Sequence, residues 1–188
     1  MVADERSAAA LELLRAHALD RVPHSAEDLL AHLQGTYALL RAWGAREALA
    51  LAGLSHSVFG TEMFGGEALP ASLREALRAR IGDEAARLVW LFGVIERRSF
   101  TAAARGQGPA RARLTGAVLE LEDRDLADLA ELYAANAVEQ LPRLPRICAL
   151  VERELLSPCA ALLSPAASEA LATVESADED DVLFDDEP

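Results

Sequence analysis

The stretch ALALAGLSHS, residues 48–57, decides the fold class, because it is apolar on nearly every side of the helix that it predicts. A helix without a polar face is usually enclosed by other helices rather than exposed to water. The sequence therefore predicts a central buried helix over about residues 46–58. This helix carries one histidine, His56, into the interior near its end.

The rest of the chain predicts an all-α bundle of six to eight helices. Leu and Ala dominate the composition, whereas Val, Ile and Thr are sparse, and this favours helices over strands. We expect Ser25 to cap the helix that precedes the central one, and Gly44 to end it. The length suits a single domain, which we place at residues 1–168.

The remaining segment, residues 169–188, is predicted to be a disordered tail. It holds nine acidic residues and no basic one, out of a net charge of −13 for the whole chain. Such a segment lacks the apolar content that would order it by itself. Because VLF, residues 182–184, stands among these acids, a protein partner for the tail is one expectation, and a plain solubilising end is the other.

Composition excludes several classes of function. The chain is acidic and all its basic residues are arginine, so we expect neither a nucleic-acid binder nor a Schiff-base enzyme. Two cysteines are too few for a disulfide framework and are expected to be reduced thiols. No stretch predicts a signal peptide or a membrane span, and we therefore expect a cytoplasmic protein without membrane contact.

The spacing of the histidines predicts a shared site. His32 and His56 are 24 residues apart, and Gly44 lies midway between them. Consecutive helices with a short link are usually antiparallel neighbours, so equal arms place both histidines at the same height. The alternative is two separate core histidines. His24 lies about 12 Å along the helix from His32, too far to share an ion, but it can line the same cleft.

The pattern of His32, Gly44 and LAGLSHS resembles the opening of the HD superfamily, a helical fold of metal-dependent phosphohydrolases with some iron oxygenases. The hydrolase domain of the RelA/SpoT stringent-response proteins has a similar spacing, with an Ala/Leu-rich helix that ends in His-Asp. A bacterial domain of unknown function placed among HD-like folds also has a similar pattern. The resemblance covers about residues 23–145 and implies an HD-like helical domain.

This sequence departs from the HD pattern at both motif aspartates. Ser57 follows the second histidine, and Asn136 stands where the late aspartate is expected. The resemblance implies that His32, His56 and Asn136 hold a divalent iron, manganese or zinc ion. With neutral ligands alone, that ion would be bound more weakly and would stay more Lewis-acidic.

Other polar residues are candidates for the same site. His24, Ser57 and Glu62 are the candidate catalytic residues, and Arg97 and Arg98 suit a phosphate or carboxylate group of a substrate. Each has a plainer alternative. Glu62 can be a surface acid of its loop, the arginines can be a solvated helix end, and Asn136 can bond a neighbouring helix.

Two functions follow from these expectations. The first is an HD-like enzyme that acts on a small molecule, by hydrolysis of a phosphoester or by oxygen chemistry at iron. The second is a binding or regulatory protein that kept the helical shell and lost the chemistry.

Overall fold

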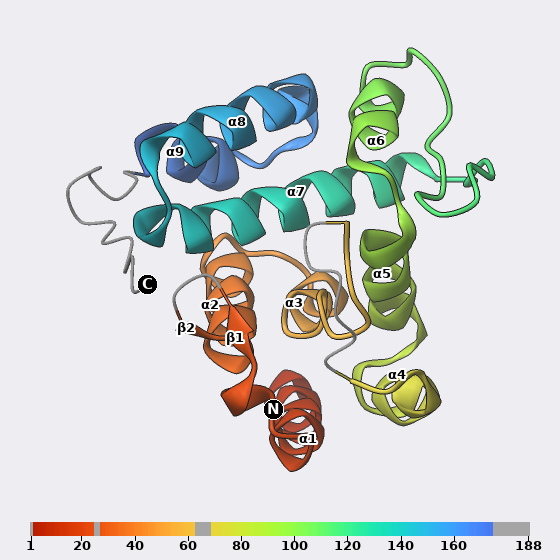
Figure 1. Cartoon of the computed structure of the whole chain (residues 1–188), viewed down its shortest axis with the longest axis vertical. Coiled ribbons are helices and arrows are strands. Elements are labelled where there is room, and N and C mark those ends of the chain that lie inside the picture. The colour runs from red at the N-terminus through yellow and green to blue at the C-terminus, as the bar shows by residue number, and fades with distance from the viewer. Residues whose placement is uncertain (1, 25–26, 63–68, 175–188) are drawn as a thin grey trace, which may run out of the picture.

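The computed structural model describes residues 2–24, 27–62 and 69–174, which form a mostly helical fold with one small hairpin (Figure 1). The α-helices are α1 (Val2–Ala16), α2 (Leu29–Ala42), α3 (Glu47–Gly53), α4 (Arg74–Ile81), α5 (Asp83–Val94), α6 (Arg97–Ala104), α7 (Asp123–Gln140), α8 (Arg146–Leu156) and α9 (Pro165–Thr173). Short 3-10 helices are η1 (Leu19–Arg21), η2 (Ala71–Leu73), η3 (Leu141–Arg143) and η4 (Ser157–Leu162). The hairpin pairs β1 (Pro23–His24) with β2 (Glu27–Asp28) in antiparallel register.

The central helix is α3, as the apolar stretch predicts. It contacts α2, α5 and α7, which enclose it in Figure 1, and its residues from Leu49 to Gly53 are buried. Helix α2 reaches α3 through a tight reversal at Gly44, whose φ of 77° suits glycine. Gly53 allows α2 and α3 to approach closely, because a Cβ there would lie 2.6 Å from Leu40 Cδ1.

The prediction that the central helix continues to about residue 58 is wrong. Helix α3 ends at Gly53, and the chain then passes through turns closed by hydrogen bonds from Val58 N to Ser55 O and from Gly60 N to Ser57 O. His56 therefore lies on a turn rather than on a helix. Its imidazole Nδ1 is 2.8 Å from the carbonyl oxygen of Gly53, so the side chain caps one of the carbonyls that the short helix leaves free.

The described residues contain nine α-helices, where the sequence predicts six to eight. One addition arises over residues 83–100, where the sequence predicts a single helix capped by Asp83; the chain breaks into α5 and α6 at Ile95, which is extended and bridges to Ala112. The other is α9, which crosses the boundary predicted between residues 168 and 169. Asp28, not Ser25, caps α2 by accepting from Ala31 N, and Ser25 lies outside the described residues.

The long helix α7 is fixed by two buried carboxylates. Asp128 forms a bidentate ion pair with Arg46, just before α3. Glu131 accepts hydrogen bonds from the backbone N–H and the hydroxyl of Ser164, at the start of α9. These contacts hold α7 against both the central helix and the C-terminal helices, and α7 can then present side chains to the interior.

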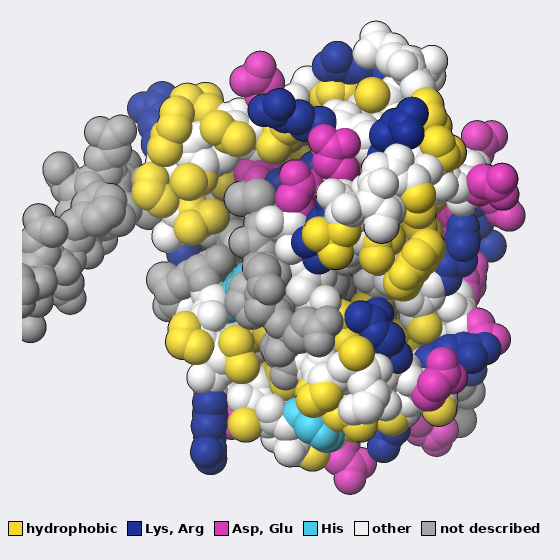
Figure 2. All heavy atoms as spheres, turned by 45° about the vertical axis from the view of Figure 1, so that its right-hand side comes forward, with side chains coloured by type: hydrophobic (Ala, Val, Ile, Leu, Met, Phe, Trp, Pro, Cys, Tyr) yellow, Lys and Arg dark blue, Asp and Glu magenta, His cyan; other side chains and the backbone are white. Residues whose placement is uncertain are grey.

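The surface is mixed in charge. Figure 2 shows arginine and acidic side chains interspersed over one face, with hydrophobic side chains gathered in several patches. Within the part of the chain that the structure describes, no helix combines the length and the apolar character needed to cross a membrane.

The role of α3 can be tested by one matched pair of substitutions. Leu51 in α3 is 1% exposed and Leu114 in a loop is 81% exposed. We expect Leu51→Ala to lower the free energy of unfolding by about 2–5 kcal/mol, because it leaves a cavity in the core. Leu114→Ala should change it by less than about 0.5 kcal/mol. Urea unfolding measures both, and similar losses for the two variants would contradict the central placement of α3.

Candidate functional site

Two buried imidazoles meet at the centre of the fold. His32 on α2 is 0% exposed and His56 after α3 is 1% exposed. Their Nε2 atoms lie 3.1 Å apart, and their ring planes are inclined by 76°. The structure thus brings together the two histidines whose equal distance from Gly44 suggests a shared site.

The hydrogen-bond partners of these imidazoles fix where their protons lie. His56 Nδ1 faces the carbonyl oxygen of Gly53, which can only accept, so Nδ1 carries the proton. His32 Nδ1 donates in the same way to the carboxylate of Glu139. Burial lowers the pKa of both His32 and His56 to about 3, and both rings are therefore neutral at pH 7. It follows that both Nε2 atoms present lone pairs to each other.

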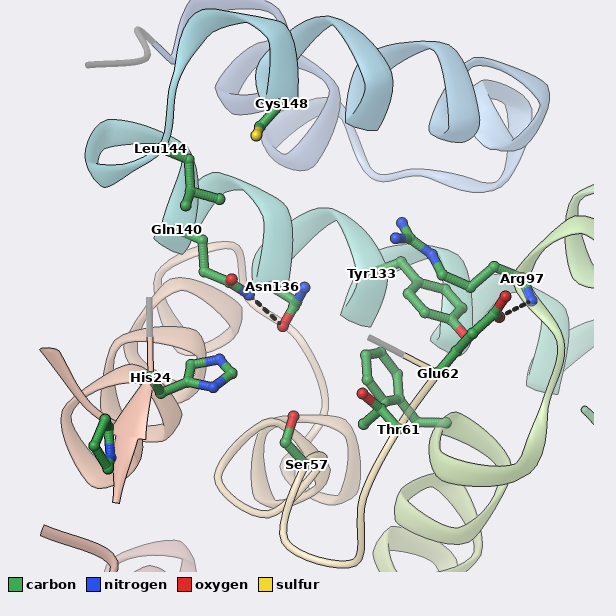
Figure 3. A pocket seen from close by; sticks show the side chains of 12 residues that line it. His24, Ser57, Thr61, Glu62, Arg97, Tyr133, Asn136, Gln140, Leu144 and Cys148 are labelled. Atoms are coloured by element: carbon green, nitrogen blue, oxygen red, sulfur yellow. Dashed lines mark hydrogen bonds between the residues drawn. The ribbon is translucent and has the colours of Figure 1, made fainter. Parts of the chain in front are cut away.

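A third acceptor points at the same spot. The Oδ1 atom of Asn136, on α7, is 3.0 Å from His56 Nε2. Gln140 Nε2, one turn further along α7, donates to that oxygen at 3.0 Å and so orients the amide (Figure 3). Turning both amides over would supply an N–H to His56, but it would still leave the two imidazole Nε2 atoms without a proton between them.

The three lone-pair atoms fit a divalent metal ion. Neighbouring ligands of an octahedral ion with bonds of about 2.1–2.2 Å lie about 3.0–3.1 Å apart, whereas tetrahedral ligands lie about 3.5 Å apart. The two separations given above match the octahedral value. Within residues 2–24, 27–62 and 69–174 there is no cluster of three His, Cys, Asp or Glu side chains that could hold a metal, so an ion at this place would need the Asn136 amide as its third protein ligand.

One carboxylate, that of Glu139, contacts this centre through His32 rather than directly. Glu139 accepts from His32 Nδ1 through one oxygen and from Arg143 through the other, at 2.6 Å. Arg143 also forms an ion pair with Glu27 at 2.7 Å. Gly35 provides room for this contact, because a Cβ there would lie 2.7 Å from Glu139 Cγ. A carboxylate in this position orients a ligating imidazole and makes it a stronger donor.

Glu139 was not among the candidate residues, although the sequence contains a signal for it. Asn136, Glu139 and Gln140 stand at i, i+3 and i+4, and a helix presents such residues on one face. Once Asn136 is a candidate, the same face of α7 includes the carboxylate and the amide that serve the centre.

A cavity of about 430 Å³ adjoins the centre (Figure 3). Asn136 and Gln140 form part of its wall, and His32 and His56 lie beneath the surface behind them. The candidate residues His24, Ser57 and Glu62 also line it. The other lining residues, apart from Arg97, are Pro23, Thr61, Phe92, Tyr133, Leu144 and Cys148.

His24 is placed to act on a molecule in this cavity. The prediction that His24 lies about 12 Å from His32 along a helix is wrong, because His24 lies on β1 rather than on α2. Its ring packs on that of His32 with 4.5 Å between centroids, at a tilt of 35°. Burial is the largest influence on the pKa of His24 and lowers it, so the ring is neutral at pH 7 and can accept a proton. Glu62 lies across the cavity, where one carboxylate oxygen accepts from the backbone N–H of Arg97 at 2.7 Å.

The two candidate arginines are placed differently. Arg97 lines the cavity, but its guanidinium forms a bidentate pair with Glu152 at 2.9 and 2.6 Å and lies over the ring of Tyr133. Arg98 is exposed and is not among the lining residues. The structure therefore brings only Arg97 to the cavity, with its charge already compensated.

Two aromatic residues of the cavity were not among the candidates. Phe92 packs against His56 at 4.9 Å between centroids and against Tyr133 at 4.5 Å. The hydroxyl of Tyr133 is buried, and no hydrogen-bond partner for it is found among the described residues. Burial raises the pKa of Tyr133, so this hydroxyl stays protonated and can donate to a bound molecule. Helical spacing alone cannot distinguish aromatic residues that line a cavity from those that only pack in the core.

The buried histidines predict how stability depends on pH in chelator-treated protein. An unfolded histidine titrates near pH 6.5, whereas His32 and His56 stay neutral down to about pH 3, so the unfolded chain binds more protons between these values. Unfolding free energy should therefore fall as the pH is lowered through 6.5, by up to about 2.7 kcal/mol per pH unit for the pair. Urea unfolding at pH 7 and pH 5 measures it.

Two variants isolate the histidine contribution from that of the carboxylates. His56→Gln should show a smaller loss between pH 7 and pH 5 than the unsubstituted protein. His17→Gln, which changes a histidine outside the centre, should show the full loss. Equal pH dependence in His56→Gln and the unsubstituted protein would contradict a buried neutral pair.

Comparison with known proteins gives one match. Residues 13–97 match a family described as a domain of unknown function (DUF6817). No curated protein and no solved structure matches the chain. The matched segment includes both imidazoles of the centre but not α7. The description of the matched family does not mention the HD superfamily. The chain is thus similar, from α1 to the start of α6, to a domain to which no activity is assigned.

Proposed function

We propose that this protein is a divergent HD-like enzyme that uses a divalent metal ion to act on a small molecule. His32 Nε2, His56 Nε2 and Asn136 Oδ1 would hold the ion, which would be iron, manganese or zinc. One observation carries the proposal: His56 Nε2 lies 3.1 Å from His32 Nε2 and 3.0 Å from Asn136 Oδ1, and the assigned tautomers place no proton between the two imidazoles. Unpaired lone pairs in a buried site repel one another, and a bound cation removes that repulsion.

The order of the donors along the chain supports the HD-like part of the proposal. His32 comes from α2, His56 follows the central α3, and Asn136 comes from the late helix α7. This is the order that the resemblance implies, with the central helix enclosed by the other two and α5 (Figure 1).

The residues around the cavity would perform the remaining steps. A divalent ion at the three donors would polarise an oxygen of a substrate or of water. His24, neutral and beside the centre, would accept a proton, and Glu62 would serve on the opposite wall. The Ser57 hydroxyl would hydrogen-bond a substrate, and Phe92 would exclude water from the floor of the cavity.

The pairing of Arg97 bears on the choice between the two reactions. A phosphate group is usually held by free guanidinium groups, but Arg97 is committed to Glu152. Every arginine of the chain lies within the described residues, and Arg97 is the one among them that lines the cavity. Oxygen chemistry at iron needs no such group and therefore receives more support from the cavity than phosphoester hydrolysis does.

The alternative is a binding or regulatory protein without a metal. This alternative is supported by the lack of charge on the three donor atoms, none of which belongs to a carboxylate. In that case the cavity would still bind a ligand through Tyr133, Glu62 and His24, and the protein would carry out no metal chemistry.

Metal titration separates these two functions. We expect chelator-treated protein to bind about one equivalent of Fe²⁺, Mn²⁺ or Zn²⁺ by calorimetry, with a rise in melting temperature. His32→Ala and His56→Ala should abolish binding, and His17→Ala should retain it. Asn136→Asp should tighten binding by about tenfold or more, because it adds a negative charge to the donor set. No binding of any of the three ions would contradict the proposal.

The position of Glu139, which contacts His32 but is not one of the three proposed ligands, predicts a partial loss of metal affinity when it is changed. Glu139→Gln should weaken metal binding by about 10–100-fold, because His32 loses the partner that orients it. Gly35→Ala should also weaken binding, since the added Cβ displaces Glu139. The double variant should bind no more weakly than Glu139→Gln, because both changes act on one contact. Glu169→Gln, on α9, is the matched control and should leave affinity unchanged; equal affinities in all four variants would exclude this role of Glu139.

A further inference from the structure

Helix α8 has an apolar face that the described residues leave open. Ile147, Leu150 and Val151 are 63%, 53% and 48% exposed, and they stand at i, i+3 and i+4. Large apolar side chains that gather on one exposed helix face commonly mark a docking surface.

Part of this face borders a groove. A cavity of about 240 Å³ lies between the end of α7 and the face of α8, and we call it the α8 groove. Its apolar wall consists of Ala137, Leu141, Leu144, Ile147, Cys148 and Val151. Leu150 is not among the lining residues, so it belongs to the exposed face but not to the groove. The cavity beside the imidazole centre and the groove have five lining residues in common, which are Arg97, Asn136, Gln140, Leu144 and Cys148.

The chain leaves the described part of the structure beside this helix. Arg153 on α8 donates to the carbonyl oxygens of Val174 and of Leu171, the latter at 3.0 Å. Residue 174 is therefore fastened to α8, and residues 175–188 continue from that point. Eight residues of extended chain reach about 26 Å, whereas Arg153 and Ile147 are separated by about 9 Å along the helix.

The chemistry of that segment complements the groove. Residues 182–184 are Val-Leu-Phe, and acids stand on both sides of them at residues 178–181 and 185–187. Arg146 is exposed next to Ile147, and no ion pair or hydrogen bond from its side chain is found among the described residues. An apolar triplet would enter the groove while its flanking acids approach an uncompensated arginine.

We propose that the α8 groove is the docking site for residues 182–184 of the same chain. Attachment through residue 174 gives the segment an effective concentration near the groove of about millimolar, so even a weak contact would be substantially occupied. The docked triplet would cover Cys148. A second copy of the chain is the competing occupant, and the experiment distinguishes the two.

The reactivity of Cys148 reports on this contact in the full chain. Cys148 is partly exposed, whereas Cys159 is buried and burial raises its pKa to about 11, so a thiol reagent such as DTNB reacts first with Cys148. We expect the double variant Leu183→Ser with Phe184→Ser to react about fivefold faster or more than the unsubstituted protein. Cys148→Ala should remove the fast phase and so identify the thiol.

Two further variants tie the effect to the groove. Leu150→Ser, on the exposed face outside the groove, should leave the rate unchanged. In protein that carries Ile147→Ser with Val151→Ser, the tail substitutions should cause no further increase, because the two sites share one interaction. Equal rates with and without the tail substitutions would overturn the proposal. A reaction rate that falls as the protein concentration rises, and that is the same with and without the tail substitutions, would also overturn the proposal, since a second copy of the chain would then cover Cys148.

Discussion

The structure depends on one electrostatic constraint, which is that three hydrogen-bond acceptors meet in a buried place with no proton to share. Each acceptor is fixed from behind: Gly53 O holds His56, Glu139 holds His32 and Gln140 holds Asn136. Because the Nδ1–H groups of both imidazoles donate away from the centre, their Nε2 lone pairs point into it, whereas Gln140 orients the amide by donating to Asn136 Oδ1 itself. Helices α2, α3 and α7 are therefore held in an arrangement in which the Nε2 lone pairs of His32 and His56 face each other in the core, which is unfavourable without a cation between them.

The position of the negative charge distinguishes this centre from one built on aspartates. Ser57 and Asn136 contribute no charge, and the carboxylate of Glu139 reaches the centre only through His32. Arg143 shares that carboxylate and Glu27 shares Arg143, so the charge is distributed over a chain of ion pairs. In the proposed metal centre this arrangement would leave the ion strongly Lewis-acidic. Its affinity would then depend on how firmly the imidazoles are oriented, more than on direct charge neutralisation.

Sequence spacing predicted the meeting of His32 and His56, because Gly44 marks a reversal midway between them, although His56 lies on the turn after α3 rather than on the helix that the prediction assumed. It failed where the outcome depends on contacts between distant segments. Helix α3 stops early, at Gly53, where the imidazole of His56 bonds the last carbonyl, and hydrophobic periodicity cannot show such a contact. Arg97 pairs with Glu152, which is 55 residues away in the sequence and lies on α8. The charge of an arginine that was predicted to bind a substrate is therefore compensated by a residue that no sequence motif connects to it. Glu139 could have been predicted from the sequence, since it shares a helix face with Asn136.

Helix α7 connects every functional feature argued above, and it lies outside the segment that matches the domain of unknown function. Its Tyr133 lines the cavity, its Asn136 would complete the proposed donor set, its Glu139 contacts His32, and its last turn borders the α8 groove. The matched segment alone supplies two imidazoles and one wall of the cavity. A protein that shares only that segment therefore need not share the third donor or the outer carboxylate. Any inference about chemistry must rest on what each chain places opposite the imidazole pair.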